Sequence, residues 1–249
     1  MRKMYVFALR NTKEILRDML TLLFGVLFPV VMLVLLTAIN AGIPDEAQMN
    51  LFEMENLVPG VVVFGLSFMS LFAATLVSKD RSSSFILRLF TSPLKASQYI
   101  AGYTLPLVPM SIVQNFVCYG MALLLGLDFS LRIFLAVAVN IPAMVLFISI
   151  GLLCGTLFND KAVGGVCGAL LTNLSAWLSG TWFDLSLVGG AFEKISQVLP
   201  FSHAVNAGRY ALSGDYNLIL PELLWVSSYA LSIMITAIVL FRVRMKQDK

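Results

Sequence analysis

The chain has 249 residues, of which 59% belong to the apolar set AVILMFWYC and only 12% are Asp, Glu, Lys or Arg. Average globular domains carry about a quarter charged residues, so a soluble fold of this size could not cover its surface with so few. The net charge of +3 is too small to indicate nucleic acid as a partner. The composition therefore predicts a chain embedded in membrane lipid.

Residues 1–18 predict an amphipathic helix on the membrane surface. Apolar residues, among them Phe7 and Ile15, fall on one side of such a helix, and basic residues such as Arg10 and Lys13 fall on the other. A basic face suits anionic lipid headgroups. The same helix could instead be a contact surface for a cytoplasmic partner.

Six uncharged stretches are each long enough to cross about 30 Å of hydrocarbon as a helix. A helix satisfies its own backbone polar groups, which lipid cannot do. We therefore predict an all-α polytopic membrane protein, with a single transmembrane domain over residues 1–249. The six stretches that contain its spans are 19–44, 56–78, 96–127, 133–159, 162–183 and 223–241.

The distribution of basic residues predicts the orientation, because Lys and Arg near span ends are retained in the cytoplasm. Fourteen of the seventeen fall in the N-terminal arm, in the gaps after the second and fourth stretches, and in the tail. Only Arg132, Lys194 and Arg209 fall on the other side. Both termini are thus expected in the cytoplasm of a multi-pass cell-membrane protein, plasma or inner, with an even number of spans.

The predicted cytoplasmic loop 79–98 reads KDRSSSFILRLFTSPLKASQ. Its serines can cap a short helix that begins near Phe85, and Pro93 would end it. Apolar residues interleave with Arg88 in a way that a mere connection does not need. A helix that inserts into a groove on another protein has this pattern, and so does a helix that rests on lipid.

The spans themselves lack ionisable residues, which argues against a proton- or sodium-coupled carrier and against a charge-ringed pore. Their most polar side chains are four amides, which either line a substrate path or form hydrogen bonds between helices. These are Gln114, Asn115, Asn140 and Asn173.

The segment 184–221 contains apolar pieces that are too short to cross, and counting one as a span would move the basic tail outside. The spacing from Phe192 to Leu199 predicts a short amphipathic helix, which Pro200 would separate from a second helix around 203–212. These helices either lie on the outer surface or re-enter the membrane.

Neither an ATP site nor a metal site is expected on this chain. The sequence has no GxxxxGK[ST] loop, and its single histidine, His203, and three separated cysteines offer no metal-ligand spacing. If ATP supplies the energy, another polypeptide must bind it together with Mg²⁺.

Two sets of motifs, in this order and topology, resemble the ABC-2 family of ABC exporter permeases over essentially the whole chain. The first runs from Asp80-Arg81 through Ser84-Phe85, Arg88-Leu89 and Ser92-Pro93 to Gly102, with Ser84 where glycine is usual. The second comprises Ser179-Gly180-Thr181-Trp182-Phe183 and the run from Leu199-Pro200 to Arg209. The second set departs from the family pattern at Asp184, where proline is common.

The resemblance implies that 79–98 holds a coupling helix that docks on a separate ATPase, and that 184–212 caps the substrate path. The implied coupling residues are Asp80, Arg81, Ser84, Phe85, Arg88, Leu89, Phe90 and Pro93. The implied outer residues are Gly180, Phe183, Pro200, His203 and Arg209.

The implied function is that of a permease subunit without enzymatic activity of its own. It would pair with an identical or similar chain, carry two cytoplasmic ATPase subunits, and export a drug, a lipid or a lipophilic peptide. Export of a lipid-linked glycan or polysaccharide is the neighbouring alternative, and a gradient-driven carrier is a more distant one.

Overall fold

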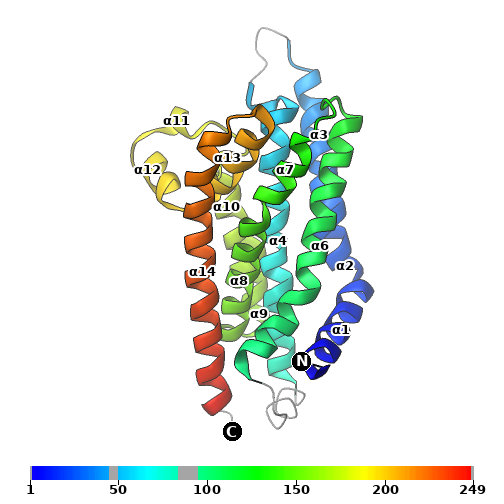
Figure 1. The fold of residues 1–249 in the computed structure, drawn as a ribbon, viewed down its shortest axis with the longest axis vertical. Helices are drawn as coiled ribbons and strands as arrows, with labels where there is room; N and C mark the ends of the chain where they lie inside the picture. The colour runs from blue at the N-terminus through cyan, green and yellow to red at the C-terminus, as the bar shows by residue number, and fades with distance from the viewer. Residues whose placement is uncertain (1, 45–49, 84–94, 248–249) are drawn as a thin grey trace.

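The computed structural model describes residues 2–44, 50–83 and 95–247, and these residues form helices and their connections, with no strand among them. The helices stand roughly parallel in an elongated bundle (Figure 1). The start of α1 (Arg2–Arg17), the end of α4 (Met54–Ser82), the start of α6 (Ala96–Leu124) and the end of α14 (Tyr216–Gln247) lie at one end. The segments predicted to be cytoplasmic therefore share one end of the molecule.

Among the described residues, five helical segments are long and apolar enough to cross a membrane. They comprise Met19–Ala41, Met54–Ser82, Ala96–Leu124, Arg132–Leu157 and Tyr216–Met245. The first consists of α2 (Met19–Leu22), the π-helical η1 (Leu23–Leu27) and α3 (Phe28–Ala41). Each overlaps one of the predicted stretches, so the all-α polytopic architecture is confirmed.

The remaining predicted stretch, 162–183, is helical only as far as Leu178. It comprises α9 (Asp160–Val163), the π-helical η4 (Gly164–Leu171) and α10 (Thr172–Leu178). This segment is not among the five candidate spans. A sixth crossing therefore stays a prediction.

The stretch 133–159 forms two helices, α7 (Arg132–Val139) and α8 (Ile141–Leu157), which meet at Asn140. Pro142 is the second residue of α8 and has no N–H to donate to the preceding turn. This missing donor explains why the helix is interrupted where the apolar pattern is continuous.

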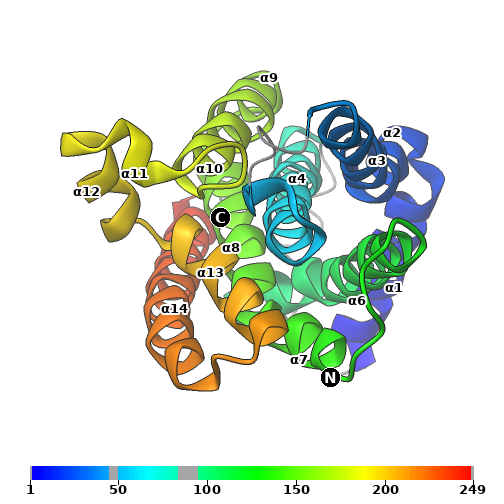
Figure 2. The ribbon, with the colours of Figure 1, turned by 90° about the horizontal axis from the view of Figure 1, so that it is seen from above.

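The helix α4 occupies the middle of the bundle, as the view from above shows (Figure 2). It contacts α3, α6, α8, η4 and the outer helix α13 (Pro200–Ser213), and every residue from Leu57 to Ser70 is buried. Its contact with α8 depends on glycine. A Cβ at Gly151 would lie 2.2 Å from the backbone oxygen of Ser70, so only glycine permits this approach.

The outer segment is shorter than the predicted 184–221, because α14 already begins at Tyr216. It contains α11 (Leu185–Val188), α12 (Gly190–Val198) and α13. The helices α11 and α12 project sideways from the end opposite the termini, whereas α13 packs against α4, α7 and α14 (Figures 1 and 2). Burial of α13 against protein meets the condition for structure that re-enters lipid. The projection of α11 and α12 from the bundle fits a position on the outer surface.

The short helix η3 (Asn50–Phe52) completes the described elements. It precedes α4 and lies at the same end of the bundle as α11 and α12 (Figure 1).

Candidate functional site

The last turn of α4 carries Asp80, a buried carboxylate that joins three helices. Its Oδ2 atom accepts a hydrogen bond of 2.6 Å from Nη1 of Arg10 on α1 and one of 2.9 Å from the hydroxyl of Tyr103 on α6. The Asp80 side chain is only 4% exposed, whereas that of Arg10 is 38% exposed. Burial acts to lower the pKa of Arg10, but Asp80 outweighs it and the pKa is raised.

Aromatic and amide contacts hold α1 against α6 beside this network. The Phe7 ring meets Tyr99 and Tyr103 edge-on, with centroids 5.8 and 4.9 Å apart. The Asn11 Nδ2 group donates to the carbonyl of Gly102 at 3.1 Å. A Cβ at Gly102 would lie 2.4 Å from the Phe7 ring, which accounts for glycine at this position. The amphipathic helix is thus bound to the bundle as well as suited to a membrane surface.

The next residue, Arg81, binds a different helix. Its Nη1 atom donates to the carbonyl oxygens of Gly155 at 2.8 Å and Phe158 at 3.2 Å, where α8 ends. A cation at a helix C-terminus is favourable, because the last carbonyls have no partners within the helix. Asp80 and Arg81 therefore connect the root of the predicted coupling loop to three other helices. The six other coupling residues lie outside the described residues: Ser84, Phe85, Arg88, Leu89, Phe90 and Pro93.

Three of the four amides predicted for a substrate path meet inside the bundle. Asn140 donates to Asn115 Oδ1 at 2.9 Å, Asn115 donates to the Ser111 carbonyl at 2.9 Å, and Gln114 donates to the Val62 carbonyl at 3.3 Å. Their residues are completely buried. Within the single chain this favours hydrogen bonding between helices over contact with substrate.

The fourth amide, Asn173, stands apart from this cluster. It is exposed on α10 and donates to the Ala169 carbonyl at 2.8 Å. A role for it in the substrate path stays a prediction.

At the other end of the bundle, Arg209 on α13 holds two segments together. Its Nε atom donates to the Asn56 carbonyl at 3.1 Å, and its Nη2 atom donates to the Gly180 carbonyl at 2.8 Å. Gly180 adopts φ +70°, a conformation that favours glycine. The glycine of the 179–183 motif therefore forms the turn whose carbonyl accepts the hydrogen bond from Arg209. Burial lowers the pKa of Arg209, with the nearby Asp184 acting to raise it.

The remaining predicted outer residues have structural contacts of their own. Pro200 is buried as the first residue of α13, where its missing N–H costs nothing. Phe183 lies against Phe192 of α12, with ring centroids 6.0 Å apart.

His203 on α13 contacts both α12 and α14. Its Nδ1 atom contacts the Glu222 carboxylate on α14, and its Nε2 atom donates to the Gln197 carbonyl at the end of α12 over 2.7 Å. Both ring nitrogens thus face acceptors, which suits the doubly protonated ring. Burial acts to lower the pKa of His203, but the contacts with Glu222 and Gln197 outweigh it, so the pKa is raised above the ordinary histidine value of about 6.5.

A family model for ABC-2 type transporters matches residues 2–213, from α1 to the end of α13. The chain belongs to the ABC-2 type transporter family. It is therefore a multi-pass membrane protein and a transmembrane subunit of a transporter. A comparison with curated proteins found no match.

Several residues that organise this ABC-2 protein were not singled out from the sequence. Arg10 and Tyr103 bind Asp80, and Glu222 binds His203. These partners lie 70, 23 and 19 positions apart in the chain. No local sequence pattern predicts such pairs. The one available signal is an acidic residue at the end of an apolar helix, which indicates that a cation lies nearby.

The His203 contact predicts that this ABC-2 protein loses stability as pH rises. Because the folded pKa of His203 is raised, its contribution is complete below the unfolded pKa of about 6.5 and is lost as pH rises through the folded pKa. We expect the thermal midpoint in detergent to fall over that range, and Glu222→Gln to flatten the dependence. An equally steep profile in Glu222→Gln would contradict this assignment.

Proposed function

We propose that this chain is the permease subunit of an ATP-driven exporter, in which 79–98 couples the membrane helices to a separate cytoplasmic ATPase. Two ATPase subunits, each binding ATP and Mg²⁺, would act on a pair of permease chains, either identical or similar. The paired bundles would move a hydrophobic or amphiphilic substrate outward across the cell membrane. ABC-2 membership supports the transporter role and generally entails an ATPase partner.

The coupling role is supported by the contacts of Asp80 and Arg81 in the last turn of α4, where the loop begins. Asp80 ties α4 to α1 and α6, and Arg81 ties it to the end of α8. A displacement of 79–98 would therefore be applied to four helices at once. Ion-paired and hydrogen-bonded groups with low exposure transmit such a displacement because they have few alternative arrangements.

Export of an amphiphile fits the chemistry of the described spans better than ion-coupled transport does. Their buried polar groups are amides and hydroxyls, apart from Asp80 at the end of α4. The partly buried Glu222 lies near the start of α14, and each of these two carboxylates already has a partner. A proton or sodium relay would need ionisable groups within the membrane.

The coupling role is tested with Leu89→Asp, which replaces one of the apolar residues of the loop sequence with a charged one. We expect the variant to insert in the membrane normally but to lose co-purification with its ATPase and ATP-dependent transport. The matched control is Leu187→Asp on α11, a residue 76% exposed at the opposite end. Unchanged co-purification and transport in Leu89→Asp would contradict the docking role. ATP hydrolysis by the purified chain alone would contradict the proposal that the ATPase is a separate subunit.

A further inference from the structure

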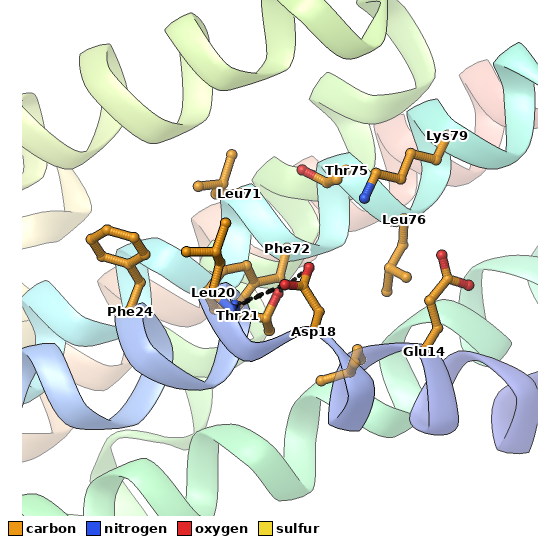
Figure 3. Close-up of a pocket in the computed structure, with 11 residues that line it drawn as sticks. Glu14, Asp18, Leu20, Thr21, Phe24, Leu71, Phe72, Thr75, Leu76 and Lys79 are labelled. Carbon is orange, nitrogen blue, oxygen red and sulfur yellow. Dashed lines mark hydrogen bonds between the residues drawn. The ribbon is translucent and has the colours of Figure 1, made fainter.

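A cavity of about 290 Å³ lies between the α1–α2 junction and the lower half of α4, beside the Asp80 network. Figure 3 shows Glu14 and Asp18 reaching into this space from the α1 side, with Lys79 and Thr75 reaching in from α4. None of these four residues belongs to the amide cluster or to the outer segment. The cavity is a separate feature of the end that carries both termini.

The lining of the cavity changes from charged to apolar along the bundle axis. From α1 into α2 the chain runs away from the end with the termini, whereas α4 runs toward that end (Figure 1). The charged groups therefore lie toward the end with the termini, and Phe24, Leu71 and Phe72 lie farther along the bundle axis from that end. This order matches an amphiphile whose headgroup stays at the interface and whose chain enters hydrocarbon.

The charged residues of the cavity carry both signs: Glu14 and Asp18 are acidic, and Lys79 is basic. Lys79 forms no ion pair or side-chain hydrogen bond with the other residues that the structure describes, and its side chain is at the cavity. The Oε2 atom of Glu14 forms an ion pair with Nη2 of Arg10 at 2.9 Å. Its other oxygen, Oε1, can therefore accept a hydrogen bond from a ligand. Asp18 accepts hydrogen bonds from Leu20, Thr21 and the Thr21 hydroxyl, and adds its negative charge nearby.

We propose that this cavity binds one zwitterionic phospholipid with a primary ammonium headgroup, its phosphate at Lys79 and its ammonium at Glu14 and Asp18. A primary ammonium donates three hydrogen bonds, whereas a quaternary one donates none, so the carboxylates favour the former. An anionic lipid without an amine would place its phosphate well but leave the carboxylates unmatched. The acyl chain would lie against Phe24 and Phe72. This site adds a bound lipid to the exporter and does not depend on the direction of transport.

The test is native mass spectrometry of the full chain in mild detergent, titrated separately with phosphatidylethanolamine, phosphatidylcholine and phosphatidylglycerol. We expect one phosphatidylethanolamine to be retained per chain in preference to the other two. Lys79→Gln should weaken its retention about fivefold, the effect of one basic residue near a lipid headgroup. Equal retention of all three lipids by the wild-type chain would overturn the proposal.

Two further variants keep the result interpretable. Glu14→Gln removes the ammonium acceptor on a different helix and should narrow the preference for phosphatidylethanolamine over phosphatidylcholine. Lys161→Gln removes an exposed cation on α9, outside the cavity, and should leave retention unchanged. Thermal midpoints establish that each variant is folded. Retention by folded Lys79→Gln and Glu14→Gln at the level of Lys161→Gln would overturn the site.

Discussion

Gly151→Ala is expected to destabilise the chain strongly, because the added methyl group would clash with the backbone of a neighbouring helix. The new Cβ would lie 2.2 Å from the Ser70 oxygen and 2.7 Å from the Ser70 Cα. Both atoms belong to the backbone of α4, so no side-chain rotation relieves the clash and the two helices must separate. Overpacking of a dense interior costs about 1–3 kcal/mol and sometimes more, and a backbone clash belongs at the upper end.

The matched control for this substitution is Gly120→Ala on α6. A Cβ at Gly120 meets nothing within 4 Å, and the residue is exposed. Alanine in a helix interior is favoured over glycine by about 0.5–1 kcal/mol, so this variant should be neutral or slightly stabilised. Thermal midpoints and the monodisperse yield in detergent measure the difference. Equal midpoints for the two variants would show that α4 and α8 are not in backbone contact.

Asp80→Ala is expected to release α1 from the bundle. The substitution leaves the Arg10 guanidinium and the Tyr103 hydroxyl without their shared acceptor. Removing one partner of a buried ion pair costs about 3–5 kcal/mol, and the 38% exposure of the Arg10 side chain reduces this to about 1–3 kcal/mol. Hydrogen exchange should show loss of protection throughout α1, and ATP-dependent transport should fall with it.

Arg10 provides the control, because it has a second acidic partner. Glu14→Gln breaks the exposed contact of 2.9 Å within α1 and should cost only about 0.3–0.5 kcal/mol. Combining Asp80→Ala with Arg10→Gln should cost less than the sum of the single changes, since the buried charge is removed with its partner. Additive effects would show that the two side chains do not interact in the folded protein.

The span-containing stretches were predictable because lipid imposes one requirement on every residue of a crossing helix. A charge-free run of about 20 residues therefore identifies a crossing helix from its own sequence, without information from other segments. The five candidate spans accordingly overlap five predicted stretches. Helix ends were less predictable. The α14 helix starts at Tyr216 rather than near 223, and Pro221 lies inside it.

The candidate site was only partly predictable. The motif from Asp80 to Arg81 was found from its order of residues, yet both side chains bind helices of their own chain. The amides Gln114, Asn115 and Asn140 were also found, but composition could not choose between a lined path and a buried cluster. That choice depends on which helix faces meet, and these faces come from residues far apart in the chain.

By itself, the sequence determined that the chain is an all-α membrane protein, because scarcity of charge and length of apolar runs act residue by residue. It also identified the family through the order of short motifs. Only the tertiary structure decided that Asp80 holds α1, that Gly151 sets the contact of α4 with α8, and that Lys79 and Glu14 line the same cavity. Such contacts depend on distances and on burial between remote segments, which no local pattern contains.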